Sequence, residues 1–281
     1  MLTLAPASQS ASAQQTATIR IVLAAVTNSQ NQAIVDLDPD DFLVEERGEE
    51  REVLSVYVAD YPVVLVLDNS SNTQGDIQAL REAAAGFVRR IGRRQVALAT
   101  LSDPPQVLGS FTDSQADILN RIGEVTISPT TVLRPVKAVA MAVKVVRTET
   151  DAPFSAIVVV STGGMHVSQP ESTSLLRDIF SSGAIVHAIS RRVPSATLGG
   201  GGSRPGLEGD PLRDLADQTG GRYTTVFSAV SYSFALDQVA ERLASEMMIE
   251  YLVPQDSKAG PEVRVGVRVP GARVRGLGVM Q

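Results

Sequence analysis

Oxygen-bearing side chains stand directly after two apolar runs of the chain and directly before a helical pattern. They include Asp68, Ser70, Asn72, Thr131 and Thr162. Carboxylate, hydroxyl and amide oxygens are hard ligands of the kind that Mg²⁺ accepts, often with only one or two carboxylates and several waters. If the fold brings these segments together, the residue types predict a divalent metal site built from loops.

A catalytic interpretation of the same segments uses Ser70 as nucleophile, His166 as base and Asp68 as the group that orients the base. The chain has no G-x-S-x-G elbow, and Asp68 and Ser70 share one loop, which makes the required Ser-His-Asp line awkward. A serine hydrolase is therefore the third hypothesis, behind two non-enzymatic roles. The other histidine, His187, lies in an apolar strand pattern and is predicted to be a hydrogen-bonded core residue.

The composition of the chain excludes several other kinds of functional site. The 281 residues include no cysteine and only two histidines, so thiolate zinc sites, cysteine nucleophiles and histidine-rich metal sites are excluded. Twenty-five basic and 31 acidic side chains give a net charge of -6. An acidic chain without tryptophan is not expected to bind nucleic acid. No apolar run approaches the ~20 residues of a spanning helix, so membrane insertion is not expected either.

The central part of the chain alternates short apolar strands with amphipathic helices. Strand patterns occupy 62–67, 95–101, 155–161, 184–189 and 222–227, and helical patterns occupy 75–91, 114–122, 133–147, 171–181, 211–219 and 234–248. This succession predicts an α/β fold, a Rossmann-like, mostly parallel sheet with helices on both faces. A short strand at 107–111 is expected to form an antiparallel edge. Ligands of such sheets bind outside the carboxyl ends of the strands, where the loop with Asp68 would lie.

Alternating strand patterns flank this region at both ends of the chain. They occupy 19–23, 33–35, 42–46, 53–58, 249–253, 262–269 and 273–279. The strands 42–46 and 53–58 are expected to form a hairpin around Gly48. Short hairpins are marginal alone, so the N- and C-terminal strands are predicted to pair into one small all-β, sandwich-like domain. The predicted units are β segments at 16–60 and 249–281 with an α/β domain, 61–248, inserted between them.

Two further segments have the composition of ends and loops. Residues 1–15 resemble the back half of a secretory signal peptide with an A-x-A site before Gln14, the alternative being a disordered tail. We therefore expect a secreted or periplasmic protein. The Gly/Pro/Ser-rich stretch 194–210 lacks the lysine and the context of a phosphate-binding loop and is interpreted as a surface loop.

Four stretches of the sequence together resemble a known family. They are VVLVLDNSSN at 63–72, SPTTVLRPVKAVAMAV at 128–143, AIVVVSTGG at 156–164 and LRDLADQTGGRY at 212–223. The chain resembles a von Willebrand factor A domain, and its flanks are similar to a bacterial subgroup described as VWFA-related domains of acidobacterial type. The resemblance covers nearly the whole chain from about Thr18.

The resemblance implies a Mg²⁺-dependent adhesion site at the upper edge of the sheet, where a carboxylate of a protein partner completes the metal coordination. Asp68 and Ser70 match the family pattern, Asn72 stands where a second serine is usual, and Thr131 matches the loop threonine. Thr162 stands where the family has its second aspartate. This departure lowers the formal charge of the site from -2 to -1, so attraction to a divalent ion falls in proportion.

We therefore expect an exported, non-enzymatic module that binds a protein ligand through these loops with weak or absent Mg²⁺ dependence. The alternative is a metal-independent structural or assembly component of an exported complex, with contacts made by the β domain or an exposed strand edge.

Overall fold

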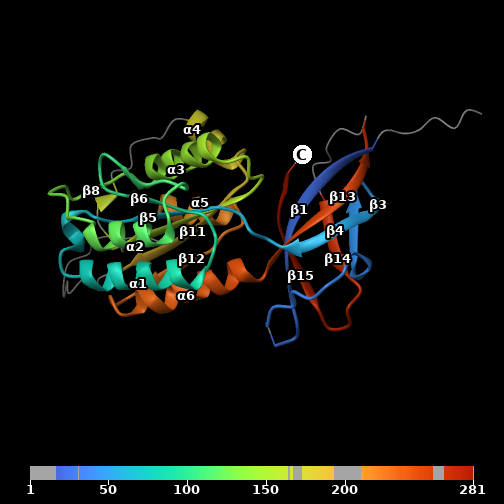
Figure 1. The fold of residues 1–281 in the computed structure, drawn as a ribbon. Coiled ribbons are helices and arrows are strands. Elements are labelled where there is room, and N and C mark those ends of the chain that lie inside the picture. Colours follow the sequence, from blue (N-terminus) through green and yellow to red (C-terminus); the bar gives the residue numbers. More distant parts are fainter. Residues whose placement is uncertain are drawn as a thin grey trace, which may run out of the picture.

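The protein consists of an α/β part and a β part that lie side by side (Figure 1). The computed structural model describes residues 17–30, 32–163, 165–166, 173–192, 210–255 and 263–280. The signal-peptide prediction for 1–15 and nearly all of the predicted loop at 194–210 lie outside the described residues. No described helix is long and apolar enough to cross a membrane.

A six-stranded sheet forms the centre of the α/β part. Its strand order is β12-β11-β9-β5-β6-β7, and all neighbours are parallel except β6 and β7. The strands are β5 (Val63–Leu67), β6 (Val96–Thr100), β7 (Val107–Gly109), β9 (Ser155–Ser161), β11 (Ala184–Arg191) and β12 (Tyr223–Val226). The predicted Rossmann-like sheet and its antiparallel edge at β7 are confirmed.

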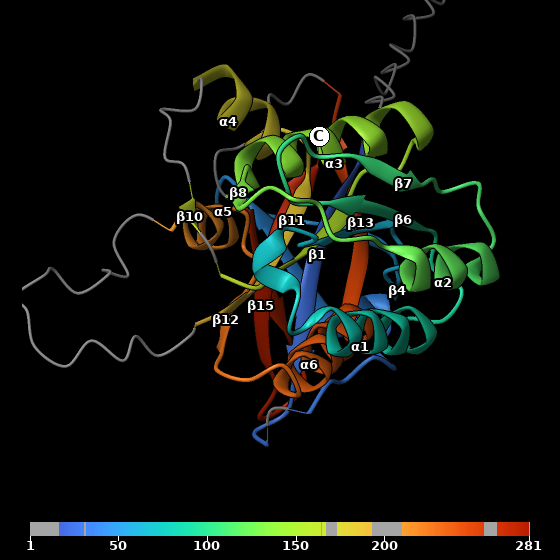
Figure 2. The ribbon, with the colours of Figure 1, turned by 90° about the vertical axis from the view of Figure 1, so that its left-hand side faces the viewer.

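Helices cover both faces of this sheet, as Figure 2 shows with α3 and α4 on one side and α1 and α6 on the other. The helices are α1 (Ile77–Arg90), α2 (Gln115–Glu124), α3 (Pro135–Glu149), α4 (Thr173–Phe180), α5 (Pro211–Gln218) and α6 (Ser231–Ala244). A small parallel pair, β8 (Val132–Leu133) and β10 (Met165–His166), forms a separate two-stranded sheet.

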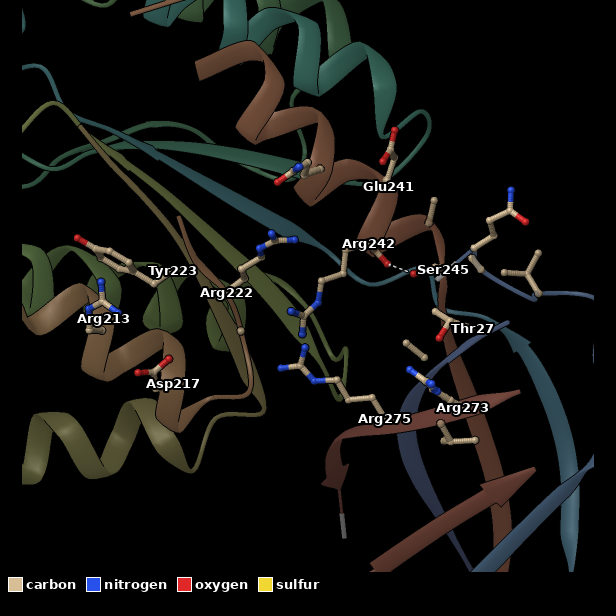
Figure 3. Close-up of a pocket in the computed structure, with 18 residues that line it drawn as sticks. Thr27, Arg213, Asp217, Arg222, Tyr223, Glu241, Arg242, Ser245, Arg273 and Arg275 are labelled. Atoms are coloured by element: carbon tan, nitrogen blue, oxygen red, sulfur yellow. Dashed lines mark hydrogen bonds between the residues drawn. The ribbon is translucent and has the colours of Figure 1, made fainter. Parts of the chain in front are cut away.

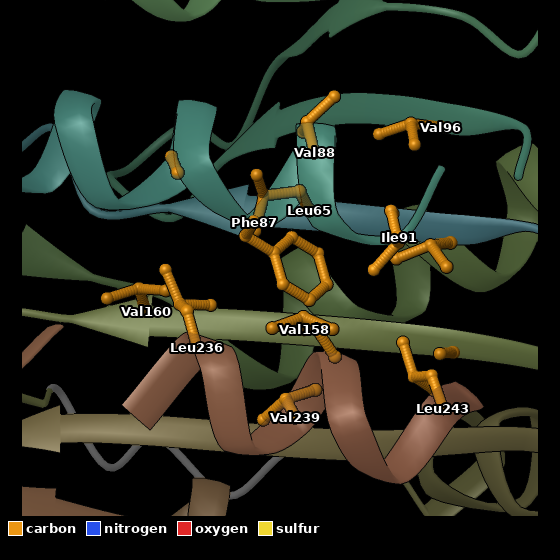
Figure 4. Packing of buried hydrophobic residues seen from close by; sticks show 14 of the residues in the cluster. Leu65, Phe87, Val88, Ile91, Val96, Val158, Val160, Leu236, Val239 and Leu243 are labelled. Carbon is orange, nitrogen blue, oxygen red and sulfur yellow. The ribbon is translucent and has the colours of Figure 1, made fainter. Parts of the chain in front are cut away.

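The centre of the sheet is buried on both faces because its strands are largely apolar there: every residue of β5 and residues 156–160 of β9 are apolar and buried. In β5, Leu65 faces the cluster under α1, α2 and α6, whereas Val64 and Val66 face the cluster under α3, α4 and α5. Phe87 of α1 lies at the centre of the first cluster, close to Val158 (Figure 4). This rigid core fixes where each strand ends, and therefore where each loop of the candidate site begins.

The β part has two antiparallel sheets packed over a common apolar core. One has the order β15-β1-β13-β4 and the other β14-β2-β3. The strands are β1 (Ala17–Thr27), β2 (Phe42–Glu46), β3 (Glu49–Arg51), β4 (Val53–Val58), β13 (Glu246–Pro254), β14 (Val263–Val267) and β15 (Arg273–Met280). Because β1 pairs with both β13 and β15, the predicted pairing of N- and C-terminal strands is confirmed.

The predicted hairpin of strands 42–46 and 53–58 is wrong. Arg47 and Gly48 both have positive φ, 57° and 78°, and this tight turn pairs β2 at once with the short strand β3. The chain then crosses to the other sheet, where β4 pairs with β13. The expected strand at 33–35 is also wrong, since only a single bridge joins Ala33 to Thr27.

The last helix begins and ends earlier than its predicted range of 234–248, at Ser231 and Ala244. Helix α6 ends at Ala244, and Glu246 already begins β13. Met247 faces the core of the β part and Met248 faces that of the α/β part. Successive side chains of a strand point to opposite faces, as these two do. Each methionine packs into a different core, so this segment forms a strand and not a further helical turn.

The chain crosses between the two parts at residues 59–62 and again at 245–246. Arg94 is bound to both crossings, because its guanidinium donates to the carbonyls of Ala59 and Leu243. The Tyr61 hydroxyl donates to the carboxylate of Glu246, and both side chains are buried. These bonds tie the two crossings to each other.

Candidate functional site

Asp68 ends the central strand β5 and is completely buried. Its amide continues the sheet by donating to the carbonyl of Val160 over 2.9 Å. Its carboxylate Oδ1 accepts a 2.9 Å hydrogen bond from the amide of Ser70, two residues ahead. This Asx-type turn fixes the start of the loop and occupies one of the two carboxylate oxygens.

Thr162, directly after β9, occupies the other oxygen of Asp68. Its amide and its hydroxyl donate to Oδ2 over 2.9 and 2.7 Å. The hydroxyl of Thr73 lies 3.0 Å from that of Thr162 and also donates to the Asp68 carbonyl over 3.2 Å. The structure thus joins the loops after β5 and β9 through one buried carboxylate and its neutral donors. Thr73 was not predicted, since nothing in its spacing distinguishes it from other loop residues.

The remaining three predicted residues differ in their surroundings. The Ser70 hydroxyl is buried and has no hydrogen-bond partner among the described residues. Asn72 and Thr131 are exposed, and the Asn72 amide donates to the Thr131 carbonyl over 3.3 Å. Asp68, Ser70 and Thr162 therefore lie in a buried cluster, beside which Asn72 and Thr131 join two loops at the surface.

A second polar cluster, missed by the sequence analysis, lies at the same edge of the sheet. Asp76 precedes helix α1, where an aspartate usually caps the helix, but its side chain makes no capping bond. Its carboxylate instead accepts hydrogen bonds from Arg191, at the end of β11, and from Tyr232 of α6. Burial and the charge of Asp76 raise the pKa of the Tyr232 hydroxyl. The pair of Arg191 and Asp76 places a guanidinium beside the loops of the candidate site.

This donor set does not suit the divalent ion that the family pattern implies. Mg²⁺ requires near-octahedral oxygen ligands and usually at least one free carboxylate. Here both oxygens of Asp68 already accept hydrogen bonds from the chain itself, and Thr162 supplies a hydroxyl and not a second carboxylate. Across the described ranges, no group of three or more His, Asp or Glu side chains is placed to hold a metal.

The histidines give no support to the hydrolase hypothesis. The carboxylate of Asp68 is bound to Ser70 and Thr162, so within the described part of the chain it orients no imidazole. His187 lies in the middle of β11, completely buried, and neither ring nitrogen has a hydrogen-bond partner among the described residues. Its prediction as a core residue is right and the predicted hydrogen bond is wrong. Burial and the nearby arginines lower the pKa of His187 to about 3.

Three large apolar side chains are exposed just beyond strand β12. Phe227, Val230 and Phe234 have 66, 80 and 68% of their surface accessible. They follow the carboxyl end of β12, whereas Asp68, Thr162 and Arg191 lie at the ends of β5, β9 and β11. The apolar residues therefore lie at the same edge of the sheet as the polar clusters. The sequence patterns indicated a strand end and a helix start here, but not that these side chains would be uncovered.

Residues 63–166 match the family model described as von Willebrand factor type A domain. No curated protein matches the chain. Among solved structures, von Willebrand factor type A from Catenulispora acidiphila is similar over 92% of this chain and 72% of its own, with 11% identity and a TM-score of 0.51. At that identity the likeness concerns the fold alone.

Two other solved structures have lower TM-scores. The conserved hypothetical protein BatB from Bacteroides thetaiotaomicron is 16% identical over 66% of this chain and 98% of its own, with a TM-score of 0.49. Proximal thread matrix protein 1 from the mussel byssus, described with a zinc occupied MIDAS motif, is 20% identical over 72% of this chain and 50% of its own, with a TM-score of 0.48. The sheet order and the helices on both faces give the α/β part of this chain the fold of a von Willebrand factor type A domain, and the family model matches residues 63–166 of it.

Proposed function

We propose that this protein is a non-enzymatic module that binds a protein partner at the carboxyl edge of its parallel sheet, without needing a divalent ion. Domains of this family commonly mediate protein interactions or adhesion. The single observation that carries the proposal is the exposure of Phe227, Val230 and Phe234 at the edge where the polar loops converge. An exported location is part of the proposal and rests on the sequence of residues 1–15.

The exposed apolar side chains supply the hydrophobic contact area that the polar loops lack. Large aromatic side chains contribute most of the binding energy of many protein interfaces, and Phe227 and Phe234 are uncovered in this chain. Scattered apolar residues on a surface are ordinary, but three within eight residues, next to polar loops, form a patch with a polar rim. Such a patch suits a protein surface better than a small polar ligand.

Independence from metal is supported by the hydrogen bonds of Asp68. A family site with two carboxylates needs a cation to offset their repulsion, whereas one carboxylate with three neutral donors is already satisfied. The loops after β5 and β9 are therefore held in place by the chain itself. A partner would find this edge organised before it binds, which lowers the entropic cost of binding.

The edge strand β4 favours a second candidate, a structural component that assembles through its β part. Among the described strands, β4 pairs with β13 alone, and its Leu54, Tyr57 and Val58 are exposed. An uncovered apolar edge can pair with another chain. In that case binding would be abolished by Val58→Lys and unaffected by changes at Phe227 and Phe234.

The test uses the purified protein as immobilised bait for an extract of the cells that produce it, in either EDTA or Mg²⁺. Wild type is compared with the double variant Phe227→Ser and Phe234→Ser, and with Phe180→Ser as a matched control. Phe180 is a partly exposed phenylalanine on α4, away from the patch. Any captured protein is then purified and titrated calorimetrically.

We expect one partner to be captured equally in EDTA and Mg²⁺, lost with the double variant and retained with Phe180→Ser. Capture that needs Mg²⁺ would disprove the metal-independent mode. Capture that survives the double variant would place the binding surface elsewhere.

A further inference from the structure

A second concave site lies on the opposite side of the α/β part, where it meets the β part. The pocket has a volume of about 1100 Å³ and is lined by both parts. Strands β1 and β15 form one wall, and the start of β12 with helices α5 and α6 forms the other (Figure 3). It lies near the amino end of β12, whereas the candidate protein-binding edge lies at the carboxyl ends of the strands.

Five arginines line this pocket, although the chain as a whole is acidic. They are Arg213, Arg222, Arg242, Arg273 and Arg275. Asp217 and Glu241 are the acidic residues of the lining, so five positive minus two negative charges leave +3 in a chain of net charge -6. Glu241 is bound to Arg90 of α1 over 2.8 Å, which offsets part of its charge outside the pocket.

Three of these guanidinium groups converge. Arg242 and Arg275 both donate to the carbonyl of Gly220, over 2.6 and 3.3 Å. Figure 3 shows the guanidinium groups of Arg242 and Arg275 facing each other from the two walls, with Arg222 on the same wall as Arg242. The pKa of Arg275 is lowered by burial and by the charges of Arg242 and Arg222, as expected when cations are held close together. Burial, followed by the charges of the same three arginines, lowers the pKa of His187.

The pocket leaves many of its donors unused. Within the described ranges, Arg222 and Arg273 make no hydrogen bond or ion pair with another side chain. The guanidinium of Arg213 stacks over the Tyr223 ring at 4.2 Å, and its buried Nε has no partner among the described residues. Of the five pocket arginines, Arg242 alone has an acidic partner among the described residues, the buried Glu246 at 3.2 Å. Like charges that converge without counter-charges repel one another, and a bound anion would remove that repulsion.

We propose that this pocket binds a small multivalent oxyanion, the chemistry shared by phosphate esters and di- or tricarboxylates. Planar guanidinium groups bind both kinds of anion through paired N–H donors. Arg222 and Arg242 would hold the anion from the α/β part, and Arg273 and Arg275 would hold it from the β part. The anion thereby bridges the two parts. This site is independent of the protein-binding function proposed above.

The test measures binding of two probes, pyrophosphate and citrate, to the full chain by calorimetry and by the shift in Tm. Sodium chloride at equal ionic strength controls for general screening. The variants are Arg222→Ala and Arg273→Ala, one from each wall, chosen because neither side chain supports a neighbour. Arg177→Ala is the control, since it removes the same charge from an exposed position on α4.

We expect at least one probe to bind with one anion per chain and to raise Tm, and each pocket variant to weaken that binding at least tenfold. Arg177→Ala should bind like wild type, and no variant should melt below wild type without the probe. Stronger binding of pyrophosphate would identify the phosphate class, and stronger binding of citrate the carboxylate class. The proposal is overturned if neither probe binds beyond the chloride control, or if Arg177→Ala weakens binding as much as the pocket variants do.

Discussion

The hydroxyl of Thr162 donates a 2.7 Å hydrogen bond to Oδ2 of Asp68, and the amide of Thr162 donates a second one of 2.9 Å to the same oxygen. Asp68 lies at the end of β5 and Thr162 at the end of β9, so this pair joins two neighbouring strands of the sheet at its carboxyl edge. A neutral side chain thus satisfies the carboxylate at the position where the family pattern has a second acid. The edge is held together by hydrogen bonds.

Thr162→Val should destabilise the protein although it keeps the shape of the side chain. It removes one donor from a buried carboxylate, and hydrogen bonds to charged groups contribute about 1.5–3 kcal/mol. Ser70→Ala is the matched control in the same cluster, because its hydroxyl has no partner among the described residues and its loss should be neutral or slightly stabilising. Urea unfolding measures both. Equal losses for the two variants would contradict the role given to the Thr162 hydroxyl.

Thr162→Asp should convert the site into one that binds a divalent ion. The new carboxylate would lie next to that of Asp68, so without metal the two charges repel each other and the variant should melt below wild type. Millimolar Mg²⁺ or Mn²⁺ should restore its Tm by preferential binding to the folded state, and should leave wild type unchanged. Scanning calorimetry in EDTA and in each ion measures this, with Thr162→Asn as the neutral control. A metal response of Thr162→Asn equal to that of Thr162→Asp would show that the second carboxylate is not responsible.

The sheet could be predicted because burial on both faces leaves a direct mark on the sequence. Every position of Val63–Leu67 is apolar, and the helices that cover it repeat apolar residues at helical spacing. The positions of Asp68 and Thr162 follow from the strand ends, so their meeting could also be predicted. The hairpin partner of β2 could not, because β3 and β4 are separated by a single residue and only the tertiary packing decides which sheet each joins.

The features of the two sites that could not be predicted depend on contacts between residues far apart in the sequence. Asp76 meets Arg191, which is 115 residues away, and no local pattern encodes that distance. The arginines of the pocket come from α5, the start of β12, α6 and β15, so they form a group only after the β part has folded against the α/β part. Likewise, the exposure of Phe227 depends on which other segments pack over it, and the local sequence does not encode this.

His187→Leu should make the protein less sensitive to acid. The pKa of His187 is about 3 in the folded protein against 6.5 ordinarily, so between these values the unfolded chain binds the extra proton. Stability is therefore fully present above pH 6.5 and is lost as the pH falls toward 3. Between pH 7 and 4.5 wild type should lose about 2–3 kcal/mol more than the variant. Urea unfolding at several pH values measures the difference, and parallel pH profiles would show that His187 does not titrate in this way.

Gly221→Ala should be severely destabilising, because the main chain of β11 leaves no room for a side chain there. A Cβ atom at Gly221 would lie 1.8 Å from the Val186 carbonyl oxygen, and backbone cannot move aside as a flexible side chain can. Gly86→Ala is the matched control, since a Cβ atom in the middle of α1 meets nothing within 4 Å. That variant should gain about 0.5–1 kcal/mol through helix propensity.

The two alanine variants also test whether the close approach of Gly221 to Val186 fixes the pocket wall that carries Arg222. Gly221 immediately precedes Arg222, so a shift of the main chain at Gly221 also moves the pocket wall. We expect Gly221→Ala to lower Tm by several degrees, which corresponds to more than about 1 kcal/mol, and to weaken pyrophosphate or citrate binding in the same samples. Gly86→Ala should raise Tm and leave anion binding unchanged. A Gly221→Ala protein that melts and binds like wild type would mean that β11 and the start of β12 lie farther apart than the structure places them.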